Sequence, residues 1–444
     1  MKPVNKLLCV LLGLVFLGIP ALSQEKLILT LDDSIALALA QNPFHLATEK
    51  KEDTAEAQVR EARAGFFPSL NAQGTATLDE KVFELEFPSF EPGQPPQRVE
   101  MDFTRDYQFS MQLNIPLFTS GRLTSGYRMA NYNLRSTQEG TRLSRQMTIY
   151  NTKSAFYGIL LFKDYVQVAE AALADTEKLF NYVKVQHEVG LASQFDLLRS
   201  EVRMVNLKPQ VIQARNNLKI MELNLKTILG LDQEQEIELD GKLEYTPVEL
   251  SLQASLESAL QYRPELQQMR YQKMIAGENL KLARSVGLPS LGVSGQFSYW
   301  ADKLKFGSNT WEDFYTVNLV LNIPIFNGLS TLARMGQAKA QIKEIEFNAK
   351  GVLDRVMFEV RQAILKVEEA KETLLSQEKN VEQAQESLRI AELNYAEGLI
   401  TILDIGQAQT ALTQARVNHS QALFNYMLAL AEVDRAAGVE ELGS

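Results

Sequence analysis

The sequence has 444 residues, of which 45% are hydrophobic and 23% are charged, and its formal net charge is −10. This composition excludes a disordered or collagen-like chain. The acidity argues against a nucleic-acid partner, which would require a basic face. One cysteine and three histidines exclude a disulfide framework and leave little material for a metal site. We therefore expect neither a metal nor a cofactor.

The first 23 residues have the pattern of a secretory signal peptide. Lys2 and Lys6 give a positively charged start, residues 7–19 are apolar, and small residues precede Gln24. The alternative is a membrane anchor, but the apolar run is short for a spanning helix. We expect cleavage before Gln24. Because no later apolar run reaches 18 residues, a mature chain that spans a membrane must do so as a closed β-barrel.

The rest of the sequence consists of two similar halves. Leu113–Phe118 recurs as Leu321–Phe326 with one exchange, and other intervals between prolines and glycines also match. The halves differ mainly at the proline-rich residues 87–99, which we interpret as an enlarged surface loop. We predict an internal duplication with a first repeat at 24–230, a linker at 231–250, a second repeat at 251–438 and a tail at 439–444.

Each half has two segments in which apolar and uncharged polar residues alternate. They lie at residues 69–78, 103–115, 290–299 and 315–323. Alternation over roughly ten residues is typical of membrane-barrel strands, which face lipid on one side and a wet lumen on the other. The alternative is a soluble sandwich, but four strands are few for one and the remaining sequence has helical patterns.

Four strands cannot close a membrane barrel, because such barrels begin at about eight strands. Two chains would give eight strands, whose interior is filled by side chains, whereas three chains would give twelve and leave a lumen. We therefore predict a homotrimer with one twelve-stranded barrel in outer-membrane lipid.

Long proline-free stretches follow the strands. Residues 120–188 predict a helix about 100 Å long at about 1.5 Å per residue. Heptad spacing in this stretch, and at 381–395 and 408–433, predicts coiled-coil pairing. The expected fold is a mixed α/β membrane protein whose barrel continues into a long coiled-coil barrel of helices.

Two turns join the paired helices of the halves. Each contains a glycine that can end a helix, a hydroxyl residue that can cap the next helix, and an aspartate three residues later. These residues are Gly190, Ser193 and Asp196 in the first turn and Gly398, Thr401 and Asp404 in the second. Capping alone would explain both aspartates, and it is compatible with a first-turn carboxylate that faces a pore.

The duplicated halves, the Asn-Ile-Pro-Leu-Phe and Asn-Ile-Pro-Ile-Phe strand ends and the Gly-Leu-x-Ser/Thr-x-x-Asp turns resemble the TolC-type outer-membrane efflux family. The resemblance covers essentially the whole mature chain. It implies a trimeric, passive exit duct of a tripartite efflux or type I secretion system, with its helices in the periplasm. Its partners would be a periplasmic adaptor (membrane-fusion protein) and an inner-membrane transporter, and it would not be an enzyme. The alternative, a periplasmic coiled-coil adaptor without a barrel, does not explain the alternating strands.

The resemblance also suggests a periplasmic gate. Asp404 matches the position of an acidic ring at the entrance, which would attract cations. Tyr395 and Asp196 match residues whose links hold neighbouring coiled coils closed, although Tyr395 can equally be a heptad core residue. Ile400 and Gln407 stand where an arginine and a second acid complete that latch, so we expect its ionic part to be missing.

The turns also carry apolar residues that a free tip should not expose. We interpret them as a docking surface for the adaptor, in preference to packing between neighbouring tips. The predicted docking tips comprise Gly190, Leu191, Ala192, Ser193, Gly398, Leu399, Ile400 and Thr401.

Overall fold

The computed structural model describes the chain except for residues 1–25, 79–82, 89–95, 102–105, 303–310 and 440–444. The predicted signal peptide and nearly all of the predicted tail lie outside the described residues. The chain divides into two compact units, and each takes segments from both predicted repeats. Unit 1 comprises the chain up to Pro43, Thr148–Val248 and Val367–Ala431, and unit 2 comprises Phe44–Met147, Glu249–Lys366 and the chain from Glu432.

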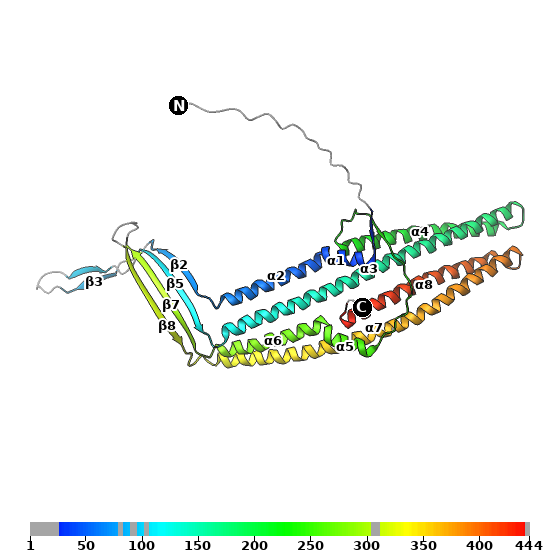
Figure 1. Cartoon of the computed structure of the whole chain (residues 1–444). Helices are drawn as coiled ribbons and strands as arrows, with labels where there is room; N and C mark the ends of the chain where they lie inside the picture. The colour runs from blue at the N-terminus through cyan, green and yellow to red at the C-terminus, as the bar shows by residue number, and fades with distance from the viewer. Residues whose placement is uncertain (1–25, 79–82, 89–95, 102–105, 303–310, 440–444) are drawn as a thin grey trace, which may run out of the picture. The chain divides into compact units, whose positions relative to one another are not determined.

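The helices of the first half have counterparts of equal length in the second half (Figure 1). The pairs are α1 (Leu31–Gln41) with α5 (Leu252–Tyr262), α2 (Pro43–Ala64) with α6 (Pro264–Ser285), α3 (Arg122–Glu188) with α7 (Ser330–Ala396), and α4 (Gln194–Leu229) with α8 (Ile402–Ala437). Both long helices have 67 residues, so the predicted long helices are confirmed. Among the described helices, none has a stretch apolar enough to cross a membrane.

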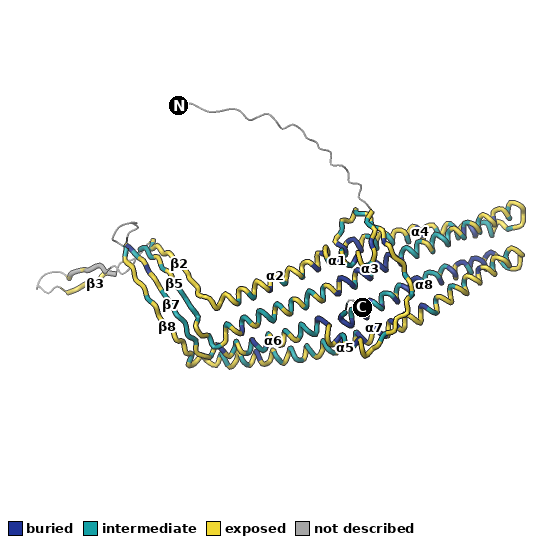
Figure 2. The backbone as a smooth tube through the Cα atoms, in the orientation of Figure 1, coloured by how far each residue is buried: buried dark blue, intermediate teal, exposed yellow. Residues whose placement is uncertain are grey.

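The four predicted strands form one antiparallel sheet in unit 2. Its order is β2 (Ser69–Ala76), β5 (Tyr107–Phe118), β7 (Ser290–Ala301) and β8 (Glu312–Asn322), so β2 and β8 are its edges. Figure 2 shows that both edge strands are exposed over most of their length. The sheet therefore presents two strands whose outer sides are not paired within the described part of the chain.

The strand register collects side chains of one kind on each face of the sheet. Leu113 lies opposite both Leu70 and Gly295, and Val293 lies opposite both Ile115 and Leu319. On the other face, polar residues meet in a row, which contains Asn71, Gln112, Gln296 and Thr316. The predicted alternation is thus confirmed, because the pairing aligns all four strands in phase.

Two further strand pairs lie outside the predicted elements. In unit 2, β3 (Phe83–Phe87) pairs with β4 (Gln97–Met101), so the interpretation of residues 87–99 as a plain loop was wrong at both of its ends. An ion pair of 2.7 Å between Arg98 Nε and Glu86 Oε1 joins these strands. In unit 1, β1 (Leu27–Leu29) pairs in parallel with β6 (Ile237–Leu239), which lies in the predicted linker.

The core of unit 1 forms where α1 and the β1–β6 pair meet α3 and α4. Its buried residues are Leu29, Ala38, Ala155, Phe156, Tyr157, Ile159, Leu160, Leu225, Leu229 and Leu239. Their burial anchors the middle of the long helix α3 to the sequence-distant strands. In Figure 2 the buried part of α3 lies beside α1.

A glycine ends the last helix of each half and lies against the residues before a proline. Gly230, with φ of +71°, follows α4 in unit 1, and Asn42 Nδ2 donates to Ile228 O at 2.8 Å. In unit 2, Gly438 has φ of +77°, and Arg263 Nη1 donates to a carbonyl oxygen near the end of α8, 3.1 Å away. We call these two sites the joints.

Candidate functional site

The two predicted turns form the tips of the hairpins α3/α4 and α7/α8 in unit 1. Gly190 and Gly398 adopt the left-handed conformation, with φ of +81° and +76°. The amide of the residue after each glycine donates back to a carbonyl near the end of the preceding helix. These bonds are Leu191 N to Gln186 O at 2.8 Å and Leu399 N to Asn394 O at 2.9 Å. This closure is the Schellman type of helix end, so the chain reverses within a few residues.

Both tip aspartates take part in helix capping. In the first tip, Ser193 Oγ accepts from Asp196 N at 3.0 Å and donates to Asp196 Oδ2 at 2.6 Å. In the second, Thr401 Oγ1 and Thr401 N donate to Asp404 Oδ2 at 2.7 and 2.8 Å. The predicted N-cap is therefore confirmed at Ser193, whereas at the second tip the Thr401 hydroxyl donates to Asp404 and the amide of Asp404 donates to Thr401 O at 3.1 Å.

Asp404 is an exposed carboxylate that stays charged into acid. The hydrogen bond from the Thr401 side chain, followed by that from the Thr401 backbone, holds the pKa of Asp404 below its ordinary value. Both bonds favour the ionised form. A negative charge is thus fixed at the start of α8, where the positive end of the helix dipole adds to its stability.

Tyr395 near the end of α7 lies close to the first hairpin. Its ring packs edge-on against Tyr182 of α3, with ring centroids 6.0 Å apart. Burial raises the pKa of Tyr395, and the negative charge of Asp196 raises it further. The charge of Asp196 therefore acts on Tyr395, and the latch between the two residues stays a prediction. Tyr395 also packs against the buried residues Leu388 and Ile405, so its alternative role as a core residue holds as well.

The apolar residues of the tips are not equally exposed. Leu191 is 77% exposed and Leu399 is 69% exposed. The expectation that Ile400 and Ala192 are also exposed was wrong, because both are partly buried. Ile400 turns inward onto the cluster around Leu388, and the carbonyl of Ala192 accepts a hydrogen bond from His187 Nδ1 at 2.9 Å.

Exposed apolar side chains beside the first tip extend the surface that the sequence pointed to. Val189 is 64% exposed and Phe195 is 67% exposed. Both flank the Gly-Leu turn, so their sequence positions were a usable signal. The tips therefore expose Leu191, Val189 and Phe195 on one hairpin and Leu399 on the other, and docking at them stays a prediction.

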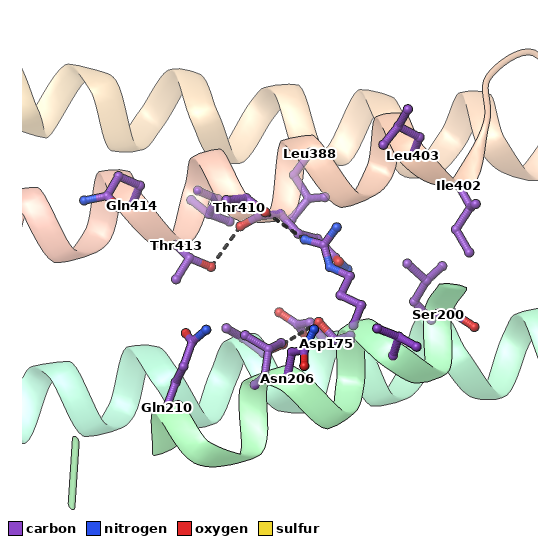
Figure 3. A pocket seen from close by; sticks show the side chains of 18 of the residues that line it. Asp175, Ser200, Asn206, Gln210, Leu388, Ile402, Leu403, Thr410, Thr413 and Gln414 are labelled. Carbon is purple, nitrogen blue, oxygen red and sulfur yellow. Dashed lines mark hydrogen bonds between the residues drawn. The ribbon is translucent and has the colours of Figure 1, made fainter. Parts of the chain in front are cut away.

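A cavity of about 540 Å³ lies between α3/α4 and α7/α8 in unit 1. In Figure 3, Ser200, Asn206 and Gln210 of α4 lie across it from Thr410 and Thr413 of α8. Its lining is mixed, with the polar residues Asp175, Asn206 and Thr410 and the apolar residues Leu388, Ile402 and Leu403. Among the described residues, no cluster of His, Cys, Asp or Glu is arranged to hold a metal ion.

Arg203 of α4 crosses this cavity and was not singled out in the sequence. Its Nη2 donates to the backbone oxygen of Gly406 and to Thr410 Oγ1, the latter at 2.8 Å. Local periodicity gives no signal for a contact between residues so far apart in the chain. A usable signal was Gly406 itself, since glycine is disfavoured inside a long helix.

Unit 2 has a four-stranded sheet with one apolar face, and unit 1 has two long helical hairpins with tight turns at their tips. These features are those of a membrane-associated duct protein. The sequence profile of the family described as outer membrane efflux protein matches residues 34–231 and 255–439. The chain belongs to this outer membrane efflux protein family. It is therefore an outer-membrane exit duct with its helical domain in the periplasm, and its class is that of channels, not of enzymes.

Known proteins resemble the chain over most of its length. It is 25% identical to the alkaline protease secretion protein AprF of Pseudomonas aeruginosa, over 93% of this chain and 87% of AprF. It is 23% identical to the outer membrane protein TolC of Escherichia coli, over 98% of this chain and 86% of TolC. Solved structures of CusC and of the Campylobacter jejuni CmeC channel share the fold with TM-scores of 0.75 at 18% and 16% identity. These alignments cover 92% of this chain with 92% of CusC and 85% of CmeC.

Proposed function

We propose that three copies of the chain form one duct, whose wall in the outer membrane is a twelve-stranded barrel with four strands from each copy. The observation that carries this proposal is the sheet of unit 2, which has an apolar face and two edge strands. Tyr315, Val317 and Leu319 on β8 are each at least 67% exposed in the single chain. Such a face is stable against lipid, and such edges are stable when paired with another chain.

The number of copies follows from the size of the lumen. Four strands cannot close, and eight strands close around an interior filled by side chains. Twelve strands leave room for a wet passage, which the polar residues Asn71, Gln112, Gln296 and Thr316 would line. The equal helix lengths of the two halves support an origin by duplication, with repeats at 24–230 and 251–438 joined by 231–250.

The mass of the purified protein tests this assembly. We expect a particle that needs detergent and contains three mature chains, each of them the 49.9 kDa chain less its first 23 residues, measured by light scattering coupled to size exclusion. A monomer that stays in water without detergent would contradict the barrel. The same result would favour the alternative of a periplasmic adaptor protein.

We propose that Asp404 of the three copies forms a ring of charge at the periplasmic entrance, with Tyr395 and Asp196 as part of its closure. Three carboxylates close together attract multivalent cations. Asp404→Asn should weaken the block of single-channel current by a trivalent cation, whereas Glu369→Gln, an exposed acid farther along the same hairpin, should not. An unchanged block in Asp404→Asn would exclude the ring.

We propose that the exposed leucines of the tips bind a periplasmic adaptor, which connects the duct to an inner-membrane transporter. Leu191 and Leu399 are the largest apolar groups exposed in the Gly-Leu turns. Leu399→Asp should abolish co-purification of the adaptor from membranes and leave the trimer intact. Gln385→Glu places the same charge on the exposed side of α7 without removing an apolar group, and it should bind normally. Equal binding by both variants would exclude this docking surface.

A further inference from the structure

The contact between Arg203 and α8 is a direct hydrogen-bonded link between the two hairpins of unit 1. Arg203 Nη2 donates to Gly406 O and to Thr410 Oγ1. Thr410 Oγ1 in turn donates to Gly406 O at 2.9 Å. The threonine hydroxyl is thereby fixed with an oxygen lone pair toward the guanidinium, so the three groups form a closed set of hydrogen bonds.

Gly406 has no side chain, and this leaves the space that the Arg203 guanidinium occupies. It lies inside α8, is buried, and does not have a positive φ, so the backbone gives no reason for glycine. A Cβ built there would overlap Arg203 Nη1. Glycine weakens a helix interior because it has the most conformational freedom to lose. We therefore attribute the glycine to the approach of the arginine.

The link is present on one side of the duplicated pattern only. The positions that match Gly406 and Arg203 in the other half are Leu198 and Ala411, because Gly190 matches Gly398. Leu198 is 51% exposed, and alanine has no group that could cross to the other hairpin. The link is thus a specific feature of this pair of surfaces and not a by-product of the repeated coiled coil.

The guanidinium lies in a partly dry environment. Burial, and next the charge of Arg199, lower the pKa of Arg203, although arginine stays protonated at any pH of interest. Its partners on α8 are a neutral carbonyl and a neutral hydroxyl. A charged donor bound to neutral acceptors is not weakened by acid, and it is less sensitive to salt than an exposed ion pair.

We propose that Arg203, Gly406 and Thr410 form a clasp that holds α7/α8 against α3/α4 of the same copy and has to release when the periplasmic entrance opens. This inference rests on the proposed function, because it assumes that the tips form the entrance. Gly406 is two residues from Asp404, so the clasp acts on the turn of α8 that carries the proposed ring. It supplies from α4 the basic side chain that Ile400 does not provide.

Conductance in planar lipid bilayers tests the clasp with variants that remove it in different ways. Arg203→Met removes the donor, Thr410→Val removes one acceptor without adding bulk, and Gly406→Ala displaces the guanidinium and changes no charge. Arg199→Met is the matched control, because Arg199 lies one helical turn away on α4, lines the same cavity, and stacks over Phe195. Thermal unfolding of each trimer is measured in parallel.

We expect Arg203→Met and Gly406→Ala to raise the ratio of open to closed pores about tenfold, the shift produced by losing one charged hydrogen bond. Thr410→Val should give a smaller rise and Arg199→Met none. The pores should respond in this order even where the unfolding temperature is unchanged, which a purely structural role would not produce. If Gly406→Ala fails to fold, the rise in Arg203→Met and Thr410→Val still supports the clasp.

Three results would overturn the clasp, and they can be told apart. If the wild-type pore is blocked by cations through Asp404 but Arg203→Met and Thr410→Val conduct as the wild type does, the clasp alone is wrong. If the wild-type protein forms no pore in the bilayer, the proposed function is wrong and the clasp falls with it. An equal rise in the ratio of open to closed pores in Arg199→Met would also overturn the clasp. The rise would then result from removing any positive charge from the cavity, not from losing the Arg203 contact.

Discussion

Asn42 in the first half and Arg263 in the second occupy matching places, each directly before the proline that begins α2 or α6. Both side chains donate to a carbonyl oxygen near the end of the last helix of their half, at 2.8 and 3.1 Å. The surroundings differ. Arg263 is only 3% exposed and forms ion pairs with Glu265 and Glu359, whereas Asn42 makes its carbonyl contact through an uncharged amide.

The two joints share some features and differ in one, which is the buried charge of the second joint. Both joints keep the proline, the glycine and a donor to the helix end. A buried guanidinium has to be accompanied by acids, because an unpaired charge is costly away from water. The second joint therefore contains an arginine with two acids, whereas the donor of the first joint is an uncharged amide. The predictions below test this difference.

The largest effect is expected from the glycines, which both joints share. A Cβ at Gly230 would lie 2.5 Å from Gln41 O, and one at Gly438 would lie 2.9 Å from Arg263 N. Both also have positive φ. Gly230→Ala should lower the free energy of unfolding by about 3 kcal/mol, measured by chemical denaturation followed by circular dichroism.

The tip glycine Gly398 provides the control for the joint glycines. Its φ of +76° is similar, but a Cβ there would meet nothing within 4 Å. Gly398→Ala should cost only the backbone strain, about 1 kcal/mol. Equal losses in Gly230→Ala and Gly398→Ala would show that close packing at the joint contributes nothing.

The next effect is expected from the charge at the second joint. Arg263→Met should destabilise the protein by about 2 kcal/mol, because it leaves Glu265 and Glu359 without their cation. Both acids keep about a quarter of their exposure, so the loss is smaller than for a fully buried pair. Adding Glu359→Gln should restore part of the stability, and a further loss in the double variant would contradict this view.

The first joint should respond less. Asn42→Leu removes one amide donor to Ile228 O, and we expect a loss of about 1 kcal/mol. The same denaturation measurement applies, so the two joints are compared directly. If Asn42→Leu lowers the free energy of unfolding as much as Arg263→Met does, the buried charge does not make the second joint more sensitive to mutation than the first.

The smallest effect concerns the pH response of the second tip. The Thr401 side chain lowers the pKa of Asp404, so the carboxylate keeps its charge, and the cap its strength, until the pH falls through that lowered value. Thr401→Val removes one of the two hydrogen bonds and should move the pKa of Asp404 back up. The block by trivalent cations should then be lost at a higher pH than in the wild type. An unchanged pH dependence would mean that the hydroxyl does not tune the ring.

The sequence predicted those elements whose signal is local. Periodicity identified the long helices and the strand pairs, and the spacing of Gly190, Ser193 and Asp196 identified the cap of the first tip. The parallel pair of Leu27–Leu29 with Ile237–Leu239 could not be predicted, since each strand has only three residues and the partners are far apart in the chain. Apolar and acidic residues alternate in Phe83–Phe87, and this local signal was missed.

The side chains that act between hairpins were the hardest to predict. Whether Ile400 faces solvent or the cluster around Leu388 depends on how the turn between α7 and α8 folds back, which a helical pattern does not define. The same holds for the contact of Arg203 with Gly406. The sequence therefore predicted which residues form the turns, but not whether each side chain faces solvent or a neighbouring helix.

The interleaved composition of the two units has a consequence for biogenesis. Unit 1 needs Val367–Ala431 and unit 2 needs the residues from Glu432 onward, so neither can be completed while the chain is still being threaded through the inner membrane. The exported polypeptide has to wait, unfolded, until its last helix arrives. A holdase chaperone keeps such an unfolded chain in solution. Depletion of that chaperone should therefore cause this protein to aggregate before it reaches the outer membrane.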